Sequence, residues 1–223
     1  IFPSSAHVVL KQGSEMPLDC LAYFIKAAHA ENIELHAWIN PYRISQVGSF
    51  GTDMTKLAAD HPARLHPEWV VKHTDGAMYF DPGIPEVRQL IVDGVMEIIN
   101  NYDVDGIHFD DYFYPDEDRL KFKDSSTYEK YKQDGQTLAD WRRSNNDALI
   151  LQVNTAIKST RSDIKFGVSP CGVWAMKSNH PLGTDIKSSM EAYYQVYADT
   201  RKWVVNEWID YICPQVYWEI NHS

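Results

Sequence analysis

One structural unit is repeated four times along the chain: a segment with the hydrophobic periodicity of a helix, followed by a short apolar strand. The predicted helices span 17–32, 85–104, 138–163 and 190–208, and the strands that follow them span 33–43, 105–115, 164–174 and 209–219. Helices that alternate with single strands are typical of a parallel sheet built from αβ units. The repeat therefore predicts an α/β fold.

The alternation of side chains within the strands favours a barrel over an open sheet. An open doubly wound sheet has helices on both faces, and its strands are apolar on both. Here each strand has one apolar face and one polar or aromatic face, which includes His36, His108 and Ser169. A (β/α)8 TIM barrel fits this pattern, and its active site lies at the C-terminal ends of the strands. Only four of the eight strands are found, so a partial barrel is predicted.

Composition and charge limit the classes of function. The 223 residues are 44% hydrophobic and 23% charged, which is ordinary for a globular protein, and a single domain is predicted over 1–223. The net charge of −10 argues against nucleic-acid binding, which needs a basic surface. No apolar run approaches the roughly 20 residues of a membrane span, and no signal peptide is recognised. The chain begins IFPSSAHVVL, so a processed or truncated chain is expected.

The stretch VDGIHFDDYFYP, residues 104–115, carries two adjacent acids at the end of the second strand. Asp110 continues the inward phase of His108, and Asp111 lies where the strand should end. Glycoside hydrolysis needs two carboxyl groups, one to protonate the leaving oxygen and one to stabilise or attack the sugar. An acidic turn or a helix N-cap is the plainer alternative. The inward histidine and the aromatic residues that follow favour a site.

Polar and aromatic side chains also gather at the ends of the other strands. Aromatic faces stack on sugar rings, and Asn, Gln and Arg side chains hydrogen-bond hydroxyl and acetamide groups. Glu219 follows the fourth strand and is a third candidate catalytic carboxylate, beside Asp110 and Asp111. The predicted substrate-binding residues are His36, Trp38, Asn40, Tyr42, Arg43, His108, Tyr112, Ser169, Trp174, Gln215, Tyr217 and Trp218.

A metal site formed by His36, His108 and Asp110 is an alternative, because the two histidines occupy similar inward positions on neighbouring strands. No H-x-H or H-E-x-x-H pattern supports it, and two inward histidines can simply be hydrogen-bonded interior groups. The sequence has no Gly-rich phosphate loop and no G-x-S-x-G elbow. No cofactor is therefore expected.

Several long motifs resemble one family of bacterial glycosidases. The glycosyl hydrolase-like 10 family is similar over LHAWINPYR (35–43), YFDPGIPEVRQLIVDGVMEIINNYDVDGIHFDDYFYP (79–115), LADWRR (138–143), KFGVSPCGVW (165–174) and YADTRKWVVNEWIDYICPQVYWE (197–219). The resemblance implies a (β/α)8 barrel, of which this chain supplies about strands three to six. It also implies an exported, extracytoplasmic protein that acts on cell-wall peptidoglycan or other N-acetylamino-sugar glycans.

The second strand is more distantly similar to the D-G-x-D-x-D-x-E motif of family 18 chitinases. On that pattern Asp105 keeps the first acid and Asp110 the third. His108 replaces the second acid, and Tyr112 stands where the catalytic Glu would be, so the acid of that mechanism is missing unless Asp111 serves. Poly-N-acetylglucosamine hydrolases also carry adjacent aspartates after strand four. That similarity supports treating the two aspartates as a unit.

The resulting hypothesis is a glycosidase, with Asp111 as general acid and Asp110 as the carboxylate that stabilises or orients the reacting group. The reverse assignment stays open. A carbohydrate-binding barrel without catalysis and the metal-dependent hydrolase are the alternatives. The expected partner is a glycan. Because a partial barrel exposes sheet edges and an inner face, pairing with another chain or with missing barrel segments is also expected.

Overall fold

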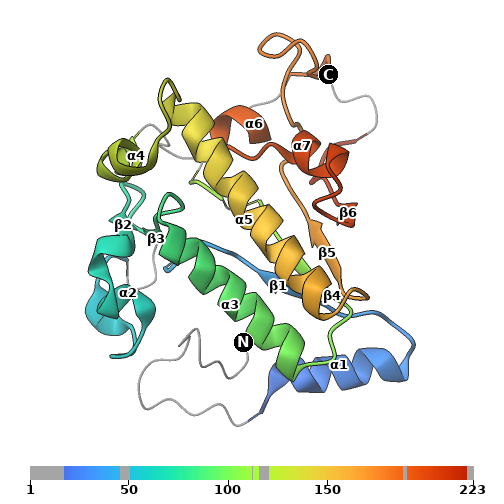
Figure 1. The fold of residues 1–223 in the computed structure, drawn as a ribbon. Helices are drawn as coiled ribbons and strands as arrows, with labels where there is room; N and C mark the ends of the chain where they lie inside the picture. The colour runs from blue at the N-terminus through green and yellow to red at the C-terminus, as the bar shows by residue number, and fades with distance from the viewer. Residues whose placement is uncertain (1–17, 46–50, 112, 116–120, 188–189, 220–223) are drawn as a thin grey trace.

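The protein is built around a parallel sheet of four strands in the order β1-β4-β5-β6 (Figure 1). The computed structural model describes residues 18–45, 51–111, 113–115, 121–187 and 190–219. The strands are β1 at His36–Ile39, β4 at Gly106–Phe109, β5 at Lys165–Val168 and β6 at Tyr211–Ile212. They are shorter than the predicted strands at both ends. The predicted parallel sheet is confirmed.

Three of the four predicted helices form close to their expected bounds: α1 at Cys20–Ala30, α3 at Pro85–Asn101 and α5 at Leu138–Thr160. Asp19 caps α1 by accepting from the Ala22 amide, and Thr137 caps α5 by accepting from the Asp140 amide. Asp and Thr are among the residues preferred at this position. Pro85 opens α3, where a missing N–H is tolerated.

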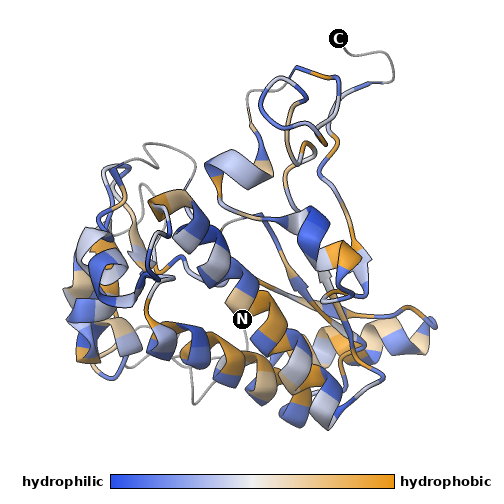
Figure 2. Cartoon of the chain, turned by 45° about the horizontal axis from the view of Figure 1, so that its top comes forward, coloured by the Kyte–Doolittle hydropathy of each residue, from blue (hydrophilic) through white to orange (hydrophobic). Residues whose placement is uncertain are grey.

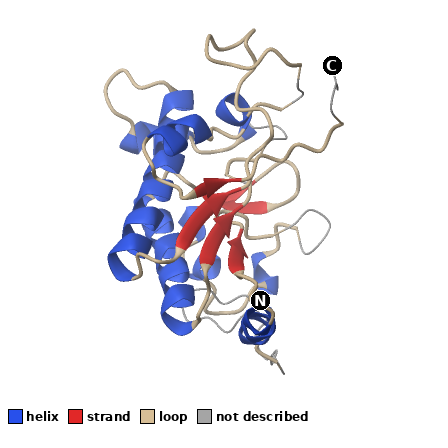
Figure 3. Ribbon diagram, turned by 90° about the vertical axis from the view of Figure 1, so that its right-hand side faces the viewer, coloured by secondary structure: helices blue, strands red, loops and turns tan. Residues whose placement is uncertain are grey.

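One face of the sheet is covered by α3 and α5. Ile107 and Phe109 of β4 and Phe166 and Val168 of β5 are fully buried in one core cluster with residues of both helices. Figure 2 shows hydrophobic and hydrophilic segments alternating along these helices, as expected when only one side is buried. In Figure 3 most of the helices lie to one side of the strands. This one-sided cover confirms the partial (β/α) barrel.

The helix predicted over 190–208 is wrong: two short helices form instead, α6 at Ala192–Gln195 and α7 at Thr200–Val205. Between them Tyr197 has a φ of 55°, in the left-handed region, which ends the helical path. Asn146 of α5 holds this break, since its Nδ2 donates to the carbonyl oxygens of Val196 and Tyr197. Tertiary hydrogen bonds therefore override the helical periodicity here.

The described residues between β1 and α3 form further short elements. The antiparallel strands β2 at Val70–Lys72 and β3 at Met78–Phe80 follow three helical turns, η1 at Met54–Lys56, α2 at Pro62–Leu65 and η2 at Pro67–Trp69. The Phe80 amide donates to the Tyr42 carbonyl oxygen, which attaches the β2–β3 hairpin to the segment that follows β1. A further helix, α4 at Ser125–Tyr131, follows β4.

Both edges of the four-stranded sheet are open among the described residues. A groove lined by Phe24, Trp38 and Val95 runs along β1, and a second groove, lined by Val204 and Ile212, runs along β6. Further strands would pair at these edges in a whole (β/α)8 barrel. Within the described ranges, none of the helices combines the length and hydrophobicity needed to cross a membrane.

Candidate active site

The C-terminal edge of the sheet brings together side chains from three strands. Asn40, Asp110 and Ser169 each follow the last residue of β1, β4 or β5, and these strands are paired in register. Asn40 Nδ2 donates to Asp110 Oδ2 over 3.4 Å. The Ser169 amide donates to the carbonyl oxygen of Phe109, which places Ser169 beside the end of β4. Three of the predicted site residues thus form one polar row.

The two adjacent acids lie in different surroundings. Asp110 is 5% exposed, whereas Asp111 is half-buried, with Cys171 Sγ 4.0 Å from its Oδ2. Because β4 ends at Phe109, the alternation of a strand no longer fixes the direction of the Asp111 side chain. Carboxyl groups in different environments can hold different protonation states, which acid–base catalysis requires.

The aromatic residues after the acids belong to the core. Phe113 and Tyr114 are each 1% exposed. Tyr114 packs edge-to-face against Phe122 and Tyr197. The aromatic residues that favoured a site in the sequence therefore include two that pack in the core and do not reach the surface. Tyr112, also predicted to bind substrate, lies outside the described residues.

The side chain of Tyr42, which is among the predicted substrate-binding residues, is fully buried. Its hydroxyl has no hydrogen-bond partner among the described residues, and burial raises its pKa above the ordinary value. Arg43 is half-buried, and its amide donates to Asn40 Oδ1 over 3.2 Å. That bond orients the Asn40 amide group so that its nitrogen faces Asp110. Trp38 is 59% exposed, on the same side of β1 as Asn40.

A tyrosine that sequence reasoning missed connects the two inward histidines. Tyr211 Oη lies 2.6 Å from His36 Nδ1 and 2.9 Å from His108 Nδ1. The Tyr211 ring lies over Gly167, where any Cβ would overlap it, and the His36 ring lies over Gly106 in the same way. Tyr211 lies four residues before Gln215, a predicted site residue of the same segment, so the period-two alternation could have placed it on the inner face.

The histidine contacts do not form a metal site. His108 Nε2 lies 2.8 Å from Ser169 Oγ, so both ring nitrogens of His108 have protein partners. Burial lowers the pKa of His108, and the nearby His36 lowers it further. In the part of the chain that the structure describes, no three His, Cys, Asp or Glu side chains are grouped to hold a metal ion. The proposed ligand set with Asp110 therefore finds no support.

Two predicted residues lie in the segments that follow β5 and β6. Gln215 Nε2 donates to the carbonyl oxygen of Ser169 over 2.8 Å, so Gln215 adjoins the polar row. Trp174 Nε1 instead donates to Asp199 Oδ1 over 3.1 Å. Gln215 is therefore placed to support the site, whereas the indole of Trp174 fastens the loop before α7.

The last described residues of the chain are mostly exposed. Tyr217 is 86% exposed, and the Trp218 ring lies over Gly172, where a Cβ would overlap it. Glu219 is exposed, and no described contact joins it to either aspartate. The structure thus does not bring Glu219 together with the two acids, and its catalytic role stays a prediction.

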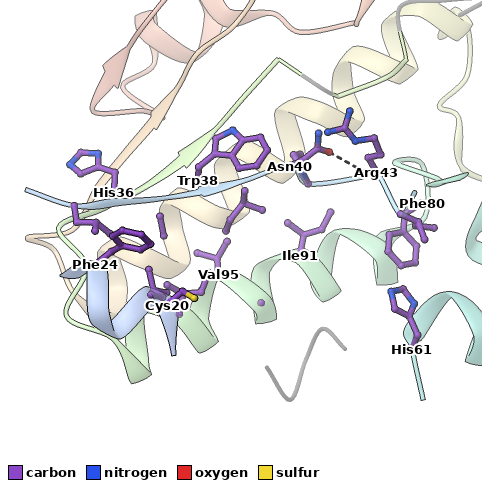
Figure 4. A pocket seen from close by; sticks show the side chains of 18 residues that line it. Cys20, Phe24, His36, Trp38, Asn40, Arg43, His61, Phe80, Ile91 and Val95 are labelled. Atoms are coloured by element: carbon purple, nitrogen blue, oxygen red, sulfur yellow. Dashed lines mark hydrogen bonds between the residues drawn. The ribbon is translucent and has the colours of Figure 1, made fainter. Parts of the chain in front are cut away.

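The groove along β1 lies beside the polar row rather than around it. Figure 4 shows His36, Trp38 and Asn40 projecting to one side of β1, while Ile91 and Val95 of α3 lie on the other. Apolar side chains of α1 and α3 form much of the groove wall. The groove is therefore the uncovered edge of the sheet, and the carboxylates are found at the strand ends.

The chain matches one protein family along nearly its whole length. The family described as Glycosyl hydrolase-like 10 matches residues 2–223. Glycosyl hydrolase YngK of Bacillus subtilis (strain 168) is 44% identical over 223 residues, covering 99% of this chain and 43% of that protein. Glycosyl hydrolase DigH of Escherichia coli (strain K12) is 40% identical over 229 residues, covering 100% of this chain and 52% of that protein. The chain thus spans about half the length of these curated relatives.

A solved structure with a similar fold is the α-L-fucosidase isoenzyme 2 from Paenibacillus thiaminolyticus. The similarity covers 80% of this chain and 26% of that one, with a TM-score of 0.50 and 15% sequence identity. At this identity the likeness bears on the fold alone. It agrees with the partial barrel that the sheet and its one-sided helices form.

Proposed function

Because the chain belongs to the glycosyl hydrolase-like 10 family, we propose that it carries the catalytic carboxylates of a glycosidase, an enzyme that hydrolyses O-glycosidic bonds. The observation that supports this most is the pair Asp110 and Asp111 at the end of β4, beside Asn40. Active sites of (β/α)8 enzymes lie at this end of the strands. Two carboxyl groups are also what most glycosidases use.

In the proposed mechanism the two acids have separate roles. The Asn40 N–H can only donate, so it suits Asp110 to act as the ionised carboxylate that stabilises or orients the reacting group. Asp111 is half-buried and lies beyond the strand end, and it protonates the departing glycosidic oxygen. Water then forms the new bond to the anomeric carbon and gives one proton to the Asp111 carboxylate, which restores the acid and completes the hydrolysis.

The proposed substrate is an N-acetylamino-sugar glycan, such as the glycan strands of bacterial cell-wall peptidoglycan. Exposed Trp38 offers an aromatic face to a sugar ring, and Asn40 and Ser169 offer hydrogen bonds to its substituents. An extracytoplasmic location, where such glycans occur, is part of the same proposal.

The test uses the natural protein at full length, with Asp110→Asn and Asp111→Asn made singly. Each is expected to lower kcat on peptidoglycan strands or chitin-type oligomers at least a hundredfold, since general acid–base catalysis typically contributes about 10²–10⁴-fold. Asp93→Asn is the matched control, because Asp93 is an exposed acid on α3, bonded to Gln89. If both site variants keep wild-type cleavage, the assignment is wrong.

The same experiment separates catalysis from binding. A carbohydrate-binding barrel without catalysis would bind these glycans and release no reducing ends. The products are read by mass, and a glycan-binding measurement accompanies each assay. Binding without cleavage by the wild-type protein would replace the glycosidase proposal with the binding one.

A further inference from the structure

A chain of hydrogen bonds crosses the inner face of the sheet and ends in the polar row. It runs from Ser169 Oγ to His108 Nε2 over 2.8 Å, and from His108 Nδ1 to Tyr211 Oη over 2.9 Å. Tyr211 Oη also lies 2.6 Å from His36 Nδ1, and His36 Nε2 lies 3.5 Å from Glu34 Oε2. These hydrogen bonds thus link side chains of β1, β4 and β6 with Ser169, which follows β5, and Ser169 is the member that reaches the site.

The single hydrogen of the Tyr211 hydroxyl limits how this chain can be arranged. Tyr211 can donate to only one of the two Nδ1 atoms that face it. Burial raises the pKa of Tyr211 to about 12, so the hydrogen is present at neutral pH. The other imidazole has to donate to the Tyr211 oxygen, because otherwise two lone pairs would face each other.

Glu34, at the far end of this series of hydrogen bonds, decides which histidine donates to Tyr211. Lys165 Nζ lies 2.7 Å from Glu34 Oε2 and lowers the pKa of Glu34, so the carboxylate is ionised. The Glu34 carboxylate, 3.5 Å from Nε2, favours a hydrogen rather than a lone pair at that nitrogen, so a neutral His36 carries its hydrogen on Nε2 and accepts from Tyr211 at Nδ1. His108 then donates from Nδ1 to Tyr211, and its Nε2 keeps a lone pair.

We infer that Tyr211, acting through His108, is a positioning residue that makes Ser169 a hydrogen-bond acceptor in the substrate site. The one hydrogen of Ser169 goes to His108 Nε2, so Oγ presents only lone pairs to the mouth of the sheet. Ser169 is half-buried, next to Asp110 in the polar row. The group it recognises is therefore a donor on the substrate, an amide or amine N–H or a hydroxyl hydrogen of a sugar. This inference rests on the proposed glycosidase and adds which substrate group is read.

The first test requires no glycan. The natural protein is labelled with 15N-histidine at full length, and the His108 signals are assigned from their loss in His108→Gln. The 15N shifts distinguish a protonated ring nitrogen from a bare one. At neutral pH we expect His108 to be neutral, with its hydrogen on Nδ1, and Tyr211→Phe to move that hydrogen toward Nε2. Tyr23→Phe, which removes an exposed hydroxyl on α1, should change nothing.

A wild-type His108 protonated on Nε2, or a Tyr211→Phe spectrum equal to wild type, overturns the inference. Neither result depends on whether the protein cleaves glycans. If the wild-type protein cleaves no glycan, the proposed function fails instead, and the nuclear magnetic resonance result still decides the tautomer.

The second test measures kinetics on N-acetylamino-sugar oligomers. Ser169→Ala and Tyr211→Phe are each expected to raise KM about tenfold, which is the contribution of one hydrogen bond to binding. The kcat of each variant should stay within about threefold of wild type. Ser169→Thr keeps the hydroxyl and should restore most of the affinity, which a purely structural defect would not allow. An unchanged KM in Ser169→Ala overturns the inference and leaves the glycosidase proposal standing.

Discussion

Arg142 on α5 and Asp124 before α4 form a buried ion pair in which two nitrogens meet two oxygens. Arg142 Nε lies 2.8 Å from Asp124 Oδ2, and Nη2 lies 2.7 Å from Oδ1. Each side chain is 1% exposed. Arg142 also donates to Tyr197 Oη over 3.0 Å and to the Phe122 carbonyl oxygen. The pair therefore fastens α5 both to the segment before α4 and to the break between α6 and α7.

Arg142→Met is expected to lower the free energy of unfolding by about 3–5 kcal/mol, because it leaves the Asp124 charge buried without its partner. Urea denaturation of the natural protein measures the change. Lys132→Met is the control, since it removes an exposed ion pair with Glu129 and should change the free energy by about 1 kcal/mol or less. Equally small changes in the free energy of unfolding of the two variants would contradict the predicted contribution of the buried ion pair.

A second prediction concerns Asp81, which follows β3 and is 3% exposed. Burial raises its pKa from the ordinary 3.8 to about 6, although Thr127 Oγ1 and the Gly83 amide both donate to its carboxylate. Between about pH 4 and about pH 6 the folded chain keeps a proton that the unfolded chain has released. The free energy of unfolding should therefore fall as pH rises through this range, with about 3 kcal/mol at most due to Asp81.

Asp81→Asn isolates this contribution because it imitates the protonated acid. The free energy of unfolding of the variant minus that of wild type should be larger at about pH 7 than at about pH 4. Urea denaturation at a series of pH values measures the difference. Asp93→Asn, an exposed acid, should follow wild type at every pH. Parallel pH profiles for wild type and Asp81→Asn would show that Asp81 does not titrate in this range.

A third prediction tests how the Tyr211 ring is seated. Gly167→Ala places a Cβ where the ring lies, so it should lower the free energy of unfolding by about 1–3 kcal/mol through overpacking. In a Tyr211→Ala background the same change should be much less destabilising. Denaturation of the four proteins gives the coupling, expected to exceed about 1 kcal/mol. Additive effects would mean that the ring does not rest on Gly167.

A fourth prediction follows from the open edges of the sheet. Residues 1–223 expressed alone should self-associate, because unpaired strand edges and exposed apolar side chains such as Phe24, Trp38 and Val205 favour pairing. Size-exclusion chromatography with light scattering over a range of concentrations measures this. Phe24→Lys and Val205→Lys should weaken the association. A monomer at every concentration would contradict the prediction.

Much of the architecture followed from local patterns. The one-sided alternation of Ile107 and Phe109 predicted which face of β4 is buried, and both side chains are fully buried. Asn40, Asp110 and Ser169 share one end of the sheet because parallel strands in register deliver their next residues to the same edge. Such inferences need only the period of a strand and the direction of its neighbours.

What could not be predicted depends on tertiary contacts. Tyr42 closes a strand just as Asn40 does, yet it turns into the core. The break at Tyr197 depends on Asn146, which is distant in the sequence. The alternation can place Tyr211 on the inner face, but nothing local reveals that its hydroxyl lies between two histidines. In each case the deciding partner comes from another segment of the chain.

The place of β4 in the sheet has a consequence for how the site meets its substrate. β4 has a hydrogen-bonded neighbour on both sides, β1 and β5, and its outward side chains lie in the core. Opening it would break two ladders at once, so its amides should be among the slowest in the molecule to exchange with solvent. Asp110 is attached directly to the end of this strand. The carboxylate is thus held in a stiff frame, and in the proposed glycosidase the substrate rather than this strand would have to adjust when the two meet.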